Sequence, residues 1–444
     1  MNPTMPRWYG WLWRGVLPFA LLRLWWRGRR EPGYRRNIGE RLGRYPPLAD
    51  VAPVIWIHAV SVGETRAAEP LVARLRDRYP EHRIVLTHMT AAGRATGASL
   101  FGARITQAYL PYDTAAATAA FLDWCRPRFG LLMETELWPN IIGLAAARRI
   151  PLFLVNARMS ERSARGYRRF AGISATMLRR LAGIAAQTEA DAGRIRSLGA
   201  AEVVVTGNVK FDAAIPEAAI EHGRTLRAQF GAARPVWMAG STRDGEEALL
   251  LDALERAVLP GDALPTGALL LLVPRHPQRF DGVAALLAQR GIEFVRRSAG
   301  GPVPASAAVV LGDTMGEMLG YYAAADVAFV GGTLLPLGGQ NLIEPLAVGT
   351  PVLIGASTFN FAEVARDALA RGAAWQGADA AAIIGAVGRL LGDASTRTQM
   401  RDAGLQMLAA HRGATVRTVD WIAGKLGGTD GDEAGAVPAP GIGD

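Results

Sequence analysis

The stretch VIWIHAVSVGET (54–65) decides the fold, because it joins a short apolar run to a polar turn that bears a glycine. An apolar run without strict alternation is typical of a parallel strand buried on both faces. The turn leads into a segment that we expect to be helical from about Thr65. A strand, a loop and a helix in this order predict the repeating unit of a doubly wound α/β sheet.

Runs of the same kind recur along the chain, with spacers long enough for crossover helices. A first series of candidate strands spans 54–59, 84–88, 105–111, 130–135, 152–156, 183–188 and 202–207. A second series spans 235–240, 269–276, 292–297, 308–313, 326–332 and 351–355. The polar, Ala-rich stretch 212–233 between the two series is interpreted as a linker. Two such series predict two Rossmann-like, doubly wound domains that face each other across a cleft, with ligands at the carboxyl ends of the strands.

The composition agrees with a two-domain α/β protein. The chain has 444 residues, of which half are hydrophobic, and 51 are Gly. Its single cysteine, Cys125, excludes an internal disulfide and a multi-Cys metal site, and is interpreted as a buried apolar residue. The chain contains neither GxxxxGK[ST] nor HExxH, which argues against P-loop and zincin chemistry. We therefore expect no cofactor and no metal.

The positive charge collects at the amino terminus. Residues 1–44 hold ten Arg against two Glu, a net charge of +8 out of the chain's +9, so the remaining chain is nearly neutral. The same segment holds five of the eleven Trp, on both sides of the apolar run 15–22. Arg14, Pro18 and Arg23 make this run too short and too broken for an ordinary bilayer span. Trp and Arg around an apolar centre favour an anchor at a membrane surface on the cytoplasmic side.

Three other interpretations of residues 1–45 stay open: a single short span, a helix that packs on the body, and a nucleic-acid-binding arm. A nucleic-acid binder should spread basic residues over the body, which this chain does not do. We therefore expect no nucleic-acid partner. The tail 427–444 has too few apolar residues to pack and is expected to be disordered.

Three polar clusters follow strands of the first series. In HAVSVGET (58–65), Glu64 would lie on the first helical turn, where burial could raise its pKa enough for a general base; alternatively it only complements the helix dipole. In METELWPN (133–140), Glu134 and Glu136 end an apolar strand, and Trp138 is either a wall for an acceptor or a core residue. In TGNVKFD (206–212), Lys210 could meet a sugar carboxylate or a phosphate, or be a solvated charge.

The second series carries candidate contacts for a nucleotide. VPRHPQRF (273–280) presents Arg275 and His276 directly after a strand, where they suit an anion. The Gly-rich segment 331–355 places Asn341 and Glu344 at the start of a helix, so that amides could bind phosphate and the carboxylate could accept from ribose hydroxyls. The turn in 313–318 is a further candidate contact for the base or the ribose.

In this order and spacing after a Trp- and Arg-rich amino terminus, five motifs resemble those of the 3-deoxy-D-manno-octulosonic acid (Kdo) transferases. The motifs are HAVSVGE, ETELWPN, GNVKFD, PRHPQRF and GGQNLIEPLAVGTPVLIG. The resemblance runs from the amino-terminal segment to about residue 425. It implies a fold of the GT-B type, with a membrane-associated segment at 1–45, an acceptor-binding domain at 50–215 and a nucleotide-sugar-binding domain at 234–426.

The resemblance also implies the substrates, the location and the site. The donor would be CMP-Kdo, the acceptor the acylated glucosamine disaccharide precursor of lipid A, and the location the cytoplasmic face of the cell inner membrane. By motif position, Glu64 looks like the catalytic base, and Glu136 and Lys210 look like the pair that stabilises the transition state. The positions that look like contacts to CMP are Pro274, Arg275, Met315, Gly316, Glu317, Asn341, Leu342, Ile343 and Glu344. Apolar Leu342 and Ile343 could offer only backbone or packing contacts.

The residues and the resemblance lead to one mechanistic hypothesis. Glu64 would deprotonate an acceptor hydroxyl, which attacks the anomeric carbon of Kdo in one inverting displacement. Positive side chains, Lys210 and Arg275, would offset the negative charge of the donor carboxylate and of the leaving phosphate. Two other function classes remain: a GT-B transferase that uses a UDP-sugar, and a non-catalytic nucleotide-sugar-binding protein. The presence of both Glu64 and Glu136 argues against the non-catalytic alternative.

Overall fold

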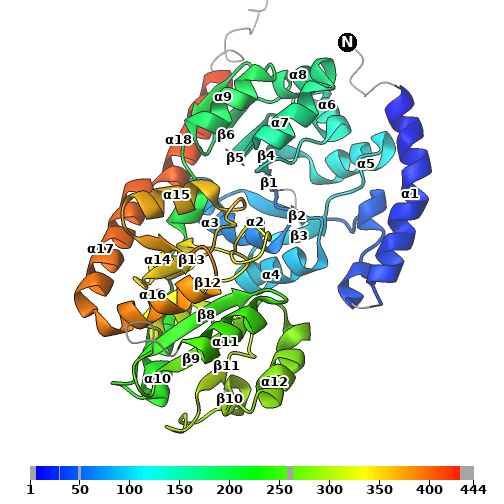
Figure 1. Ribbon diagram of the computed structural model, residues 1–444. Coiled ribbons are helices and arrows are strands. Elements are labelled where there is room, and N and C mark those ends of the chain that lie inside the picture. Colours follow the sequence, from blue (N-terminus) through cyan, green and yellow to red (C-terminus); the bar gives the residue numbers. More distant parts are fainter. Residues whose placement is uncertain (1–6, 30, 49–51, 258–263, 431–444) are drawn as a thin grey trace, which may run out of the picture. The chain divides into compact units, whose positions relative to one another are not determined.

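The computed structural model describes residues 7–29, 31–48, 52–257 and 264–430, and the chain divides by its contacts into two units. Unit 2 is Ala214–His411, and unit 1 consists of the described residues before and after it. Each unit contains a seven-stranded parallel sheet with helices on its faces (Figure 1). The α/β fold with two doubly wound sheets that the sequence predicts is therefore confirmed.

Unit 1 has the strand order β3-β2-β1-β4-β5-β6-β7. The strands are β1 (Val54–His58), β2 (Arg83–His88), β3 (Thr106–Tyr109), β4 (Pro127–Met133), β5 (Leu152–Ala157), β6 (Gly183–Ala186) and β7 (Val203–Val205). The helices after β1 are α2 (Val62–Ala67), α3 (Glu69–Arg78), α4 (Ala91–Phe101), α5 (Ala115–Cys125), α6 (Pro139–Ala147), α7 (Glu161–Arg168), α8 (Ala171–Arg179) and α9 (Glu189–Ser197). All seven runs of the first series are strands.

The core of unit 1 lies on both faces of its sheet, as expected for parallel strands. In β1, Trp56 packs with Phe121 of α5 on one face, while Ile57 belongs to the cluster on the other face. That second cluster includes Ile422 of α18 (Ala414–Asp430). The chain therefore returns to unit 1 at its end, which the sequence-based assignment of 234–426 to one domain did not anticipate. Most of the expected disordered tail, 431–444, lies outside the described residues.

Unit 2 has the strand order β10-β11-β9-β8-β12-β13-β14. The strands are β8 (Val236–Thr242), β9 (Leu269–Pro274), β10 (Phe294–Arg296), β11 (Val309–Leu311), β12 (Val327–Val330), β13 (Val352–Ile354) and β14 (Ala374–Gln376). The helices are α10 (Glu217–Phe230), α11 (Glu246–Arg256), α12 (Phe280–Gln289), α13 (Met318–Ala324), α14 (Ile343–Ala347), α15 (Ala362–Ala370), α16 (Ala380–Gly392) and α17 (Ala394–His411). The six runs of the second series are strands, and β14 is an addition.

The interpretation of 212–233 as a linker is wrong, because most of it is helix α10. Leu226 and Phe230 lie four residues apart on this helix and are both buried in the core of unit 2. A spacing of four residues places two side chains on the same helix face. The stretch thus contributes a packed element of the unit.

Both sheets have a topological switch point, where successive crossovers change direction. It lies between β1 and β4 in unit 1 and between β8 and β12 in unit 2. In open α/β sheets, the loops at the carboxyl ends of the strands on either side of such a point form the usual ligand crevice. The polar clusters after β1 and β4 in unit 1, and the Gly-rich segment after β12 in unit 2, therefore lie where a ligand is expected.

Helix α1 (Arg7–Arg27) runs along the side of unit 1 near α5 (Figure 1). The hydroxyl of Tyr9 donates to Asp113 at 2.9 Å, and the ring of Trp13 lies 5.8 Å from that of Tyr112. The rest of the helix surface is largely uncovered: Trp11, Phe19 and six further large apolar side chains are exposed. Within the described residues, no helix is both long enough and apolar enough to cross a membrane.

Candidate functional site

Glu64 lies in the first turn of α2, directly after the buried strand β1. Ser61 caps this helix, since its hydroxyl accepts from the backbone N–H of Glu64 and lies 3.3 Å from Oε1 of the same residue. The other carboxylate oxygen of Glu64 accepts from the backbone N–H of Val60 at 2.7 Å. This reciprocal pattern is similar to a capping box, which fixes the direction of the carboxylate relative to the strand. Glu64 therefore has a structural contact, and the same contact positions it.

The surroundings of Glu64 favour its neutral form. Burial raises the pKa of Glu64 to about 7, and the carboxylates of Glu134 and Glu136 act in the same direction. The hydrogen bonds from Val60 and Ser61 only partly oppose this rise. A carboxylate with a pKa near neutrality can accept a proton and later release it at physiological pH. The electrostatics of unit 1 thus suit Glu64 to general-base catalysis.

Glu134 forms an ion pair with Lys210. It directly follows β4, which is the neighbour of β1 at the switch point. Its backbone has φ 58°, in the left-handed region that is costly for residues other than Gly, and its N–H donates to the carbonyl of Val155 at 3.0 Å. Its Oε1 accepts from Nζ of Lys210 at 2.7 Å. The two side chains are 19% and 24% exposed, so bulk water screens this ion pair only in part.

Glu136 lies two residues further along the same loop, in a more apolar setting. Its Oε2 accepts from Nε1 of Trp138 at 2.8 Å and lies 3.9 Å from Nε2 of His58. Burial raises the pKa of Glu136, and the charge of Glu134 adds to this effect. Burial lowers the pKa of His58 to about 3, so the ring is neutral and its contact with Glu136 is no salt bridge. Trp138 also packs partly on the core, so it serves both as a packing residue and as a hydrogen-bond donor.

The structure thus brings three carboxylates together and places the lysine on one of them. Glu134 and Glu136 both act on the protonation of Glu64. Within the described residues, the side chain of Lys210 contacts Glu134 and not Glu136, the residue that the sequence motifs pair with it. The lysine therefore neutralises one carboxylate of the cluster, while within the described part of the chain Glu64 and Glu136 have no Lys or Arg partner.

Three amide side chains that the sequence reasoning did not select position Lys210. Asn156 accepts from the backbone N–H of Val209, while its own carbonyl accepts from the side chain of Gln187. Gln187 in turn accepts from the amide of Asn208, which caps the short helix of Lys210. Asn156 and Gln187 lie at or directly after the ends of β5 and β6, so a polar residue at the end of an apolar run was the available signal.

In unit 2, the first predicted donor contact lies at the end of β9. Pro274 is the last residue of this strand and is buried, while Arg275 is exposed just beyond it. Nε of Arg275 donates to the side-chain carbonyl of Gln340 at 3.2 Å. This bond links the arginine to the Gly-rich segment, which the sequence also assigns to the nucleotide. The guanidinium keeps its charge available, because Gln340 is neutral.

The second predicted contact is the turn Met315, Gly316 and Glu317 after β11. Met315 is 67% exposed, and Gly316 has φ 88°, which suits glycine. The carboxylate of Glu317 already accepts from the hydroxyl of Tyr321 and from Arg297. Burial alone would raise the pKa of Glu317, but these hydrogen bonds and charges outweigh burial and lower it. The side chain of Glu317 is therefore engaged by neighbouring side chains, and Met315 is the exposed side chain of this turn.

The third predicted contact is the start of α14, where the four residues differ in exposure. Oδ1 of Asn341 accepts from the backbone N–H of Ile343 at 3.0 Å. Leu342 and Ile343 are buried, so their side chains pack in the unit. Glu344 is partly exposed on the first turn of the helix. Asn341 and Glu344 are thus the members of this group that present polar side chains near the surface.

Glu246, at the start of α11, changes the expected chemistry of the Gly-rich loop. This fully buried carboxylate accepts from the backbone N–H groups of Gly332 at 2.6 Å, Leu334 at 3.0 Å and Arg243 at 2.8 Å. The expectation that loop amides bind the donor phosphate is therefore wrong for Gly332 and Leu334, whose N–H groups are already used. Sequence reasoning missed Glu246 because two of its three partners, Gly332 and Leu334, are more than 80 residues away.

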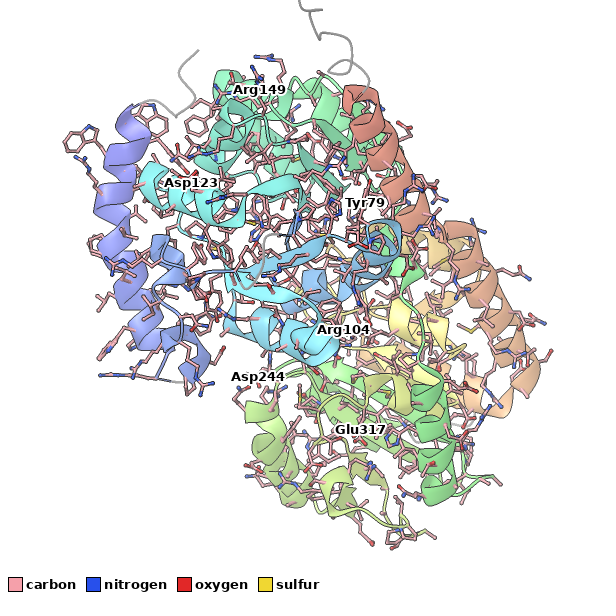
Figure 2. All side chains as sticks on the ribbon, turned by 180° about the vertical axis from the view of Figure 1, so that it is seen from behind. Tyr79, Arg104, Asp123, Arg149, Asp244 and Glu317 are labelled. Atoms are coloured by element: carbon pink, nitrogen blue, oxygen red, sulfur yellow. The ribbon has the colours of Figure 1, made fainter. Side chains whose placement is uncertain are left out.

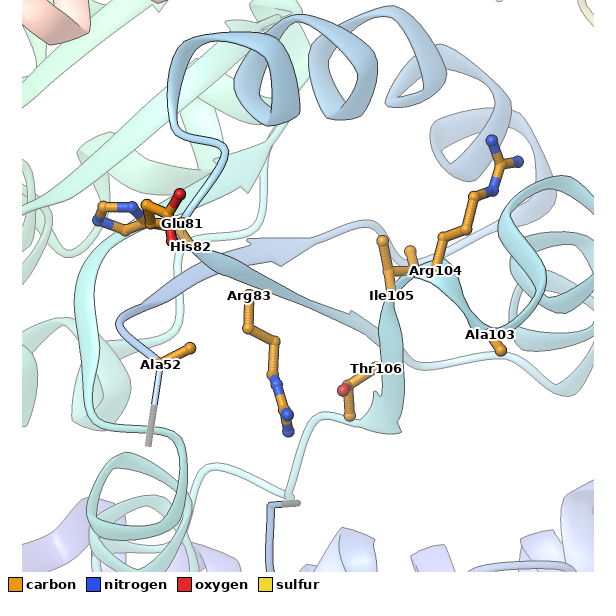
Figure 3. A pocket seen from close by; sticks show the side chains of 8 residues that line it. All are labelled: Ala52, Glu81, His82, Arg83, Ala103, Arg104, Ile105 and Thr106. Atoms are coloured by element: carbon orange, nitrogen blue, oxygen red, sulfur yellow. The ribbon is translucent and has the colours of Figure 1, made fainter. Parts of the chain in front are cut away.

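A separate pocket of about 430 Å³ lies at the other edge of the sheet of unit 1 (Figure 3). Its lining includes Arg83, the first residue of β2, and Thr106, the first residue of β3. Ligands of open α/β sheets bind at the carboxyl ends of the strands, whereas these are amino ends. This pocket is therefore distinct from the cluster around Glu64.

The chain is similar to known proteins over nearly all of its length. A family model described as "3-Deoxy-D-manno-octulosonic-acid transferase (kdotransferase)" matches residues 36–213. A 3-deoxy-D-manno-octulosonic acid transferase from Bordetella pertussis is 46% identical over 428 residues, covering 93% of this chain and 98% of that protein. Another, from Haemophilus influenzae, is 38% identical over 397 residues, covering 88% and 92%.

Solved structures show the same fold at low sequence identity. A glycosyltransferase from Rickettsia africae matches with a TM-score of 0.57 and 12% identity, covering 85% of this chain and 99% of that one. A UDP-GlcNAc 2-epimerase from Neisseria meningitidis matches with a TM-score of 0.56 and 15% identity, covering 83% and 99%. The fold is thus of the GT-B type, and the identity to the curated relatives shows that the chain belongs to the 3-deoxy-D-manno-octulosonic acid transferase family of glycosyltransferases.

Proposed function

We propose that this Kdo transferase uses CMP-Kdo as donor and the glucosamine disaccharide precursor of lipid A as acceptor, and that it inverts the anomeric centre with Glu64 as base. The observation that carries the mechanism is the setting of Glu64. Its carboxylate is fixed at the switch point of unit 1, and burial raises its pKa to about 7. The substrates are supported by the motifs of the sequence and by membership of the family.

The proposed step is a single displacement. The acceptor hydroxyl passes its proton to Glu64, and its oxygen forms a bond to the anomeric carbon of Kdo. The bond from that carbon to the phosphate oxygen breaks at the same time, and CMP leaves with the electron pair. Because attack comes from the face opposite the leaving group, the configuration is inverted.

Lys210 and Glu136 act on the charge that develops in this step. The ammonium of Lys210, held by Glu134 at 2.7 Å, is suited to the carboxylate of Kdo. Glu136, whose pKa is raised by burial, is suited to donate a hydrogen bond when it is protonated. In unit 2, Arg275, the turn at Met315 and the polar residues Asn341 and Glu344 would bind CMP.

A product assay tests this function. Purified protein is incubated with CMP-Kdo and the tetraacylated disaccharide, and the mass of the lipid product is determined by mass spectrometry. We expect a mass increase of one or more Kdo residues, inhibition by CMP and no inhibition by UDP. Inhibition by UDP instead would contradict the proposed donor, and CMP binding without any lipid product would favour the non-catalytic alternative.

We further propose that α1 holds the enzyme on the cytoplasmic face of the inner membrane. Eight large apolar side chains of this helix are exposed, and the guanidiniums of Arg14 and Arg29 lie 4.6 Å and 4.5 Å from the ring centres of Trp11 and Trp25. Indole rings and Arg stems suit the headgroup boundary of a bilayer, and the charges attract anionic lipid. The acceptor is itself a lipid, so an enzyme held at the surface would search in two dimensions.

Replacing two exposed anchors tests the membrane proposal without removing the helix. Trp11→Ser with Phe19→Ser should weaken binding to anionic vesicles about tenfold or more in a sedimentation assay. Phe170→Ser with Leu405→Ser is the matched control, because these side chains are 62% and 42% exposed elsewhere. Equal binding by the α1 variant and the unsubstituted protein would refute the anchor.

A further inference from the structure

Arg243 and Arg275 directly follow the neighbouring strands β8 and β9 of unit 2. Strands β8 and β9 are parallel, and Thr242 pairs with Pro274 at their carboxyl ends. The backbone N–H of Arg275 donates to the carbonyl of Thr242 at 3.0 Å, which fixes the next residue of each strand at the same level. Arg243 and Arg275 therefore emerge together at the edge of the sheet where ligands of this fold bind.

No acidic partner neutralises these two charges within the described part of the chain. Nε of Arg275 donates to the neutral amide of Gln340, and the side chain of Arg243 has no hydrogen bond or ion pair there. Two adjacent guanidiniums repel each other unless an anion lies between them. The pair therefore suits an anion that binds beside these strand ends.

A nearby arginine shows the contrast. Arg279 is held by Glu247 at 2.6 Å and by Asp244, labelled in Figure 2, at 3.1 Å. The charges of all three arginines act on the side chain of His276. Burial lowers the pKa of this imidazole, and the charges of Arg275, Arg243 and Arg279 lower it further. Of the three, Arg243 and Arg275 have no carboxylate partner among the residues that the structure describes.

Backbone donors close to this pair are largely taken. Glu246 accepts the N–H groups of Gly332 and Leu334, and the hydroxyl of Ser357 accepts that of Gly338. The N–H of Arg243 itself donates to Glu246. The N–H groups of these residues are therefore not available to a phosphate. The available donors beside these loops are the guanidinium side chains.

We propose that Arg243, together with Arg275, binds the phosphate of the nucleotide-sugar donor. The assignment rests on the proposed function, which supplies a phosphate-bearing donor, and it adds a binding residue outside the five motifs. A guanidinium binds phosphate with two parallel N–H groups, so two arginines can hold several phosphate oxygens at once. Glu246 has a different role from the two arginines. It stabilises the Gly-rich loop by accepting hydrogen bonds from the backbone N–H groups of that loop.

Binding of CMP and of cytidine separates the phosphate contact from all other contacts. Arg243→Gln and Arg275→Gln should each weaken CMP binding about tenfold to a hundredfold in titration calorimetry. Cytidine, which has no phosphate, should bind these variants as it binds the unsubstituted protein. Arg224→Gln is the matched control, because it removes the same charge from an arginine that is 71% exposed on α10, and it should change neither affinity.

Thermal unfolding distinguishes a ligand contact from a structural role. In the absence of nucleotide, Arg243→Gln should leave the Tm nearly unchanged, because the side chain of Arg243 makes no hydrogen bond or ion pair within the described residues. The increase in Tm that CMP causes should become smaller. A lower Tm without nucleotide, together with an unchanged increase by CMP, would show a structural role and overturn the proposal.

The remaining outcomes separate this inference from the proposed function. Equal losses of CMP and cytidine binding in Arg243→Gln would refute the phosphate contact while leaving the donor intact. If the unsubstituted protein binds UMP and not CMP, the proposed donor is wrong. The binding of UMP and uridine to Arg243→Gln would then still test whether Arg243 contacts the phosphate. If it binds neither nucleotide, both proposals fail.

Discussion

Each unit has a seven-stranded parallel sheet with a switch point, but the two units collect opposite charges at the carboxyl ends of their strands. In unit 1, Glu64, Glu134 and Glu136 come together with one cation, Lys210. In unit 2, the neighbouring strand ends carry guanidiniums and a Gly-rich loop. The comparison teaches that the fold determines where the site lies. The side chains at that position determine whether the site transfers protons or binds anions.

The units also use buried carboxylates differently. Glu246 of unit 2 has its charge offset by three backbone N–H groups, so it stabilises the fold. Glu64 of unit 1 receives one backbone N–H on its side chain and faces two further carboxylates, so its ionised form is costly. Substituting each by the isosteric glutamine should therefore have opposite consequences for stability.

The largest expected effect is on transfer by Glu64→Gln. This change removes the proton acceptor and keeps the shape, so kcat should fall by about 10²-fold to 10⁴-fold. CMP affinity should stay within about twofold, because the residues proposed to bind CMP lie in unit 2 and Glu64 lies in unit 1. Both quantities are measured on one preparation, by product formation and calorimetry. Transfer within a few-fold of the unsubstituted rate would show that Glu64 is not the base.

The next effect is on the stability of unit 2 in Glu246→Gln. The N–H groups of Gly332 and Leu334 donate to different carboxylate oxygens, so the NH₂ of the amide must face at least one of them, and the free energy of unfolding should fall by about 1–3 kcal/mol. Denaturant unfolding measures the change. Glu293→Gln, on an exposed side chain of the same unit, is the control and should be nearly neutral. Equal stability of the two variants would mean that Glu246 does not hold the loop.

Glu64→Gln should change stability in the opposite direction, and by less. The pKa of Glu64 is about 7 in the folded chain against an ordinary value of 4.5, so the folded state binds the proton more tightly. The stabilisation from this group is therefore present below pH 4.5 and is lost as the pH rises to 7. Above pH 7, Glu64→Gln should be more stable than the unsubstituted protein by on the order of 1–2 kcal/mol. Unfolding at pH 5 and pH 8 checks this, because the difference in stability between the two proteins should be clearly larger at pH 8 than at pH 5.

The sequence predicted most of the fold because parallel strands buried on both faces are visible as apolar runs. It missed β14, where only Ala374 is buried and Trp375 and Gln376 are exposed, so no apolar run exists. It mistook α10 for a linker, although the spacing of Leu226 and Phe230 already carried a helical signal.

The candidate site was predictable in part. Glu64 and Glu136 could be selected because each follows an apolar run that ends at the switch point. The partner of Lys210 could not, since Glu134 is 76 residues away in sequence and the contact depends on the left-handed backbone at that glutamate. Neither could the partners of Glu246, which are fixed by the close approach of two loops and by no local pattern.

The smallest expected effect, a shift in the pH profile, sharpens the comparison most. Glu134 is the first charged neighbour that raises the pKa of Glu64, and it also binds Lys210. Glu134→Gln removes a negative charge and frees a positive one, and both changes favour ionised Glu64. The acidic limb of the pH profile of kcat/KM, expected near pH 7, should therefore move to lower pH. Lys210→Met should move the same limb to higher pH, because it leaves Glu134 without its cation. If both variants shifted the limb in the same direction, the three carboxylates would not be coupled as their positions indicate, and the acid cluster of unit 1 would have no more bearing on proton transfer than the structural carboxylate of unit 2.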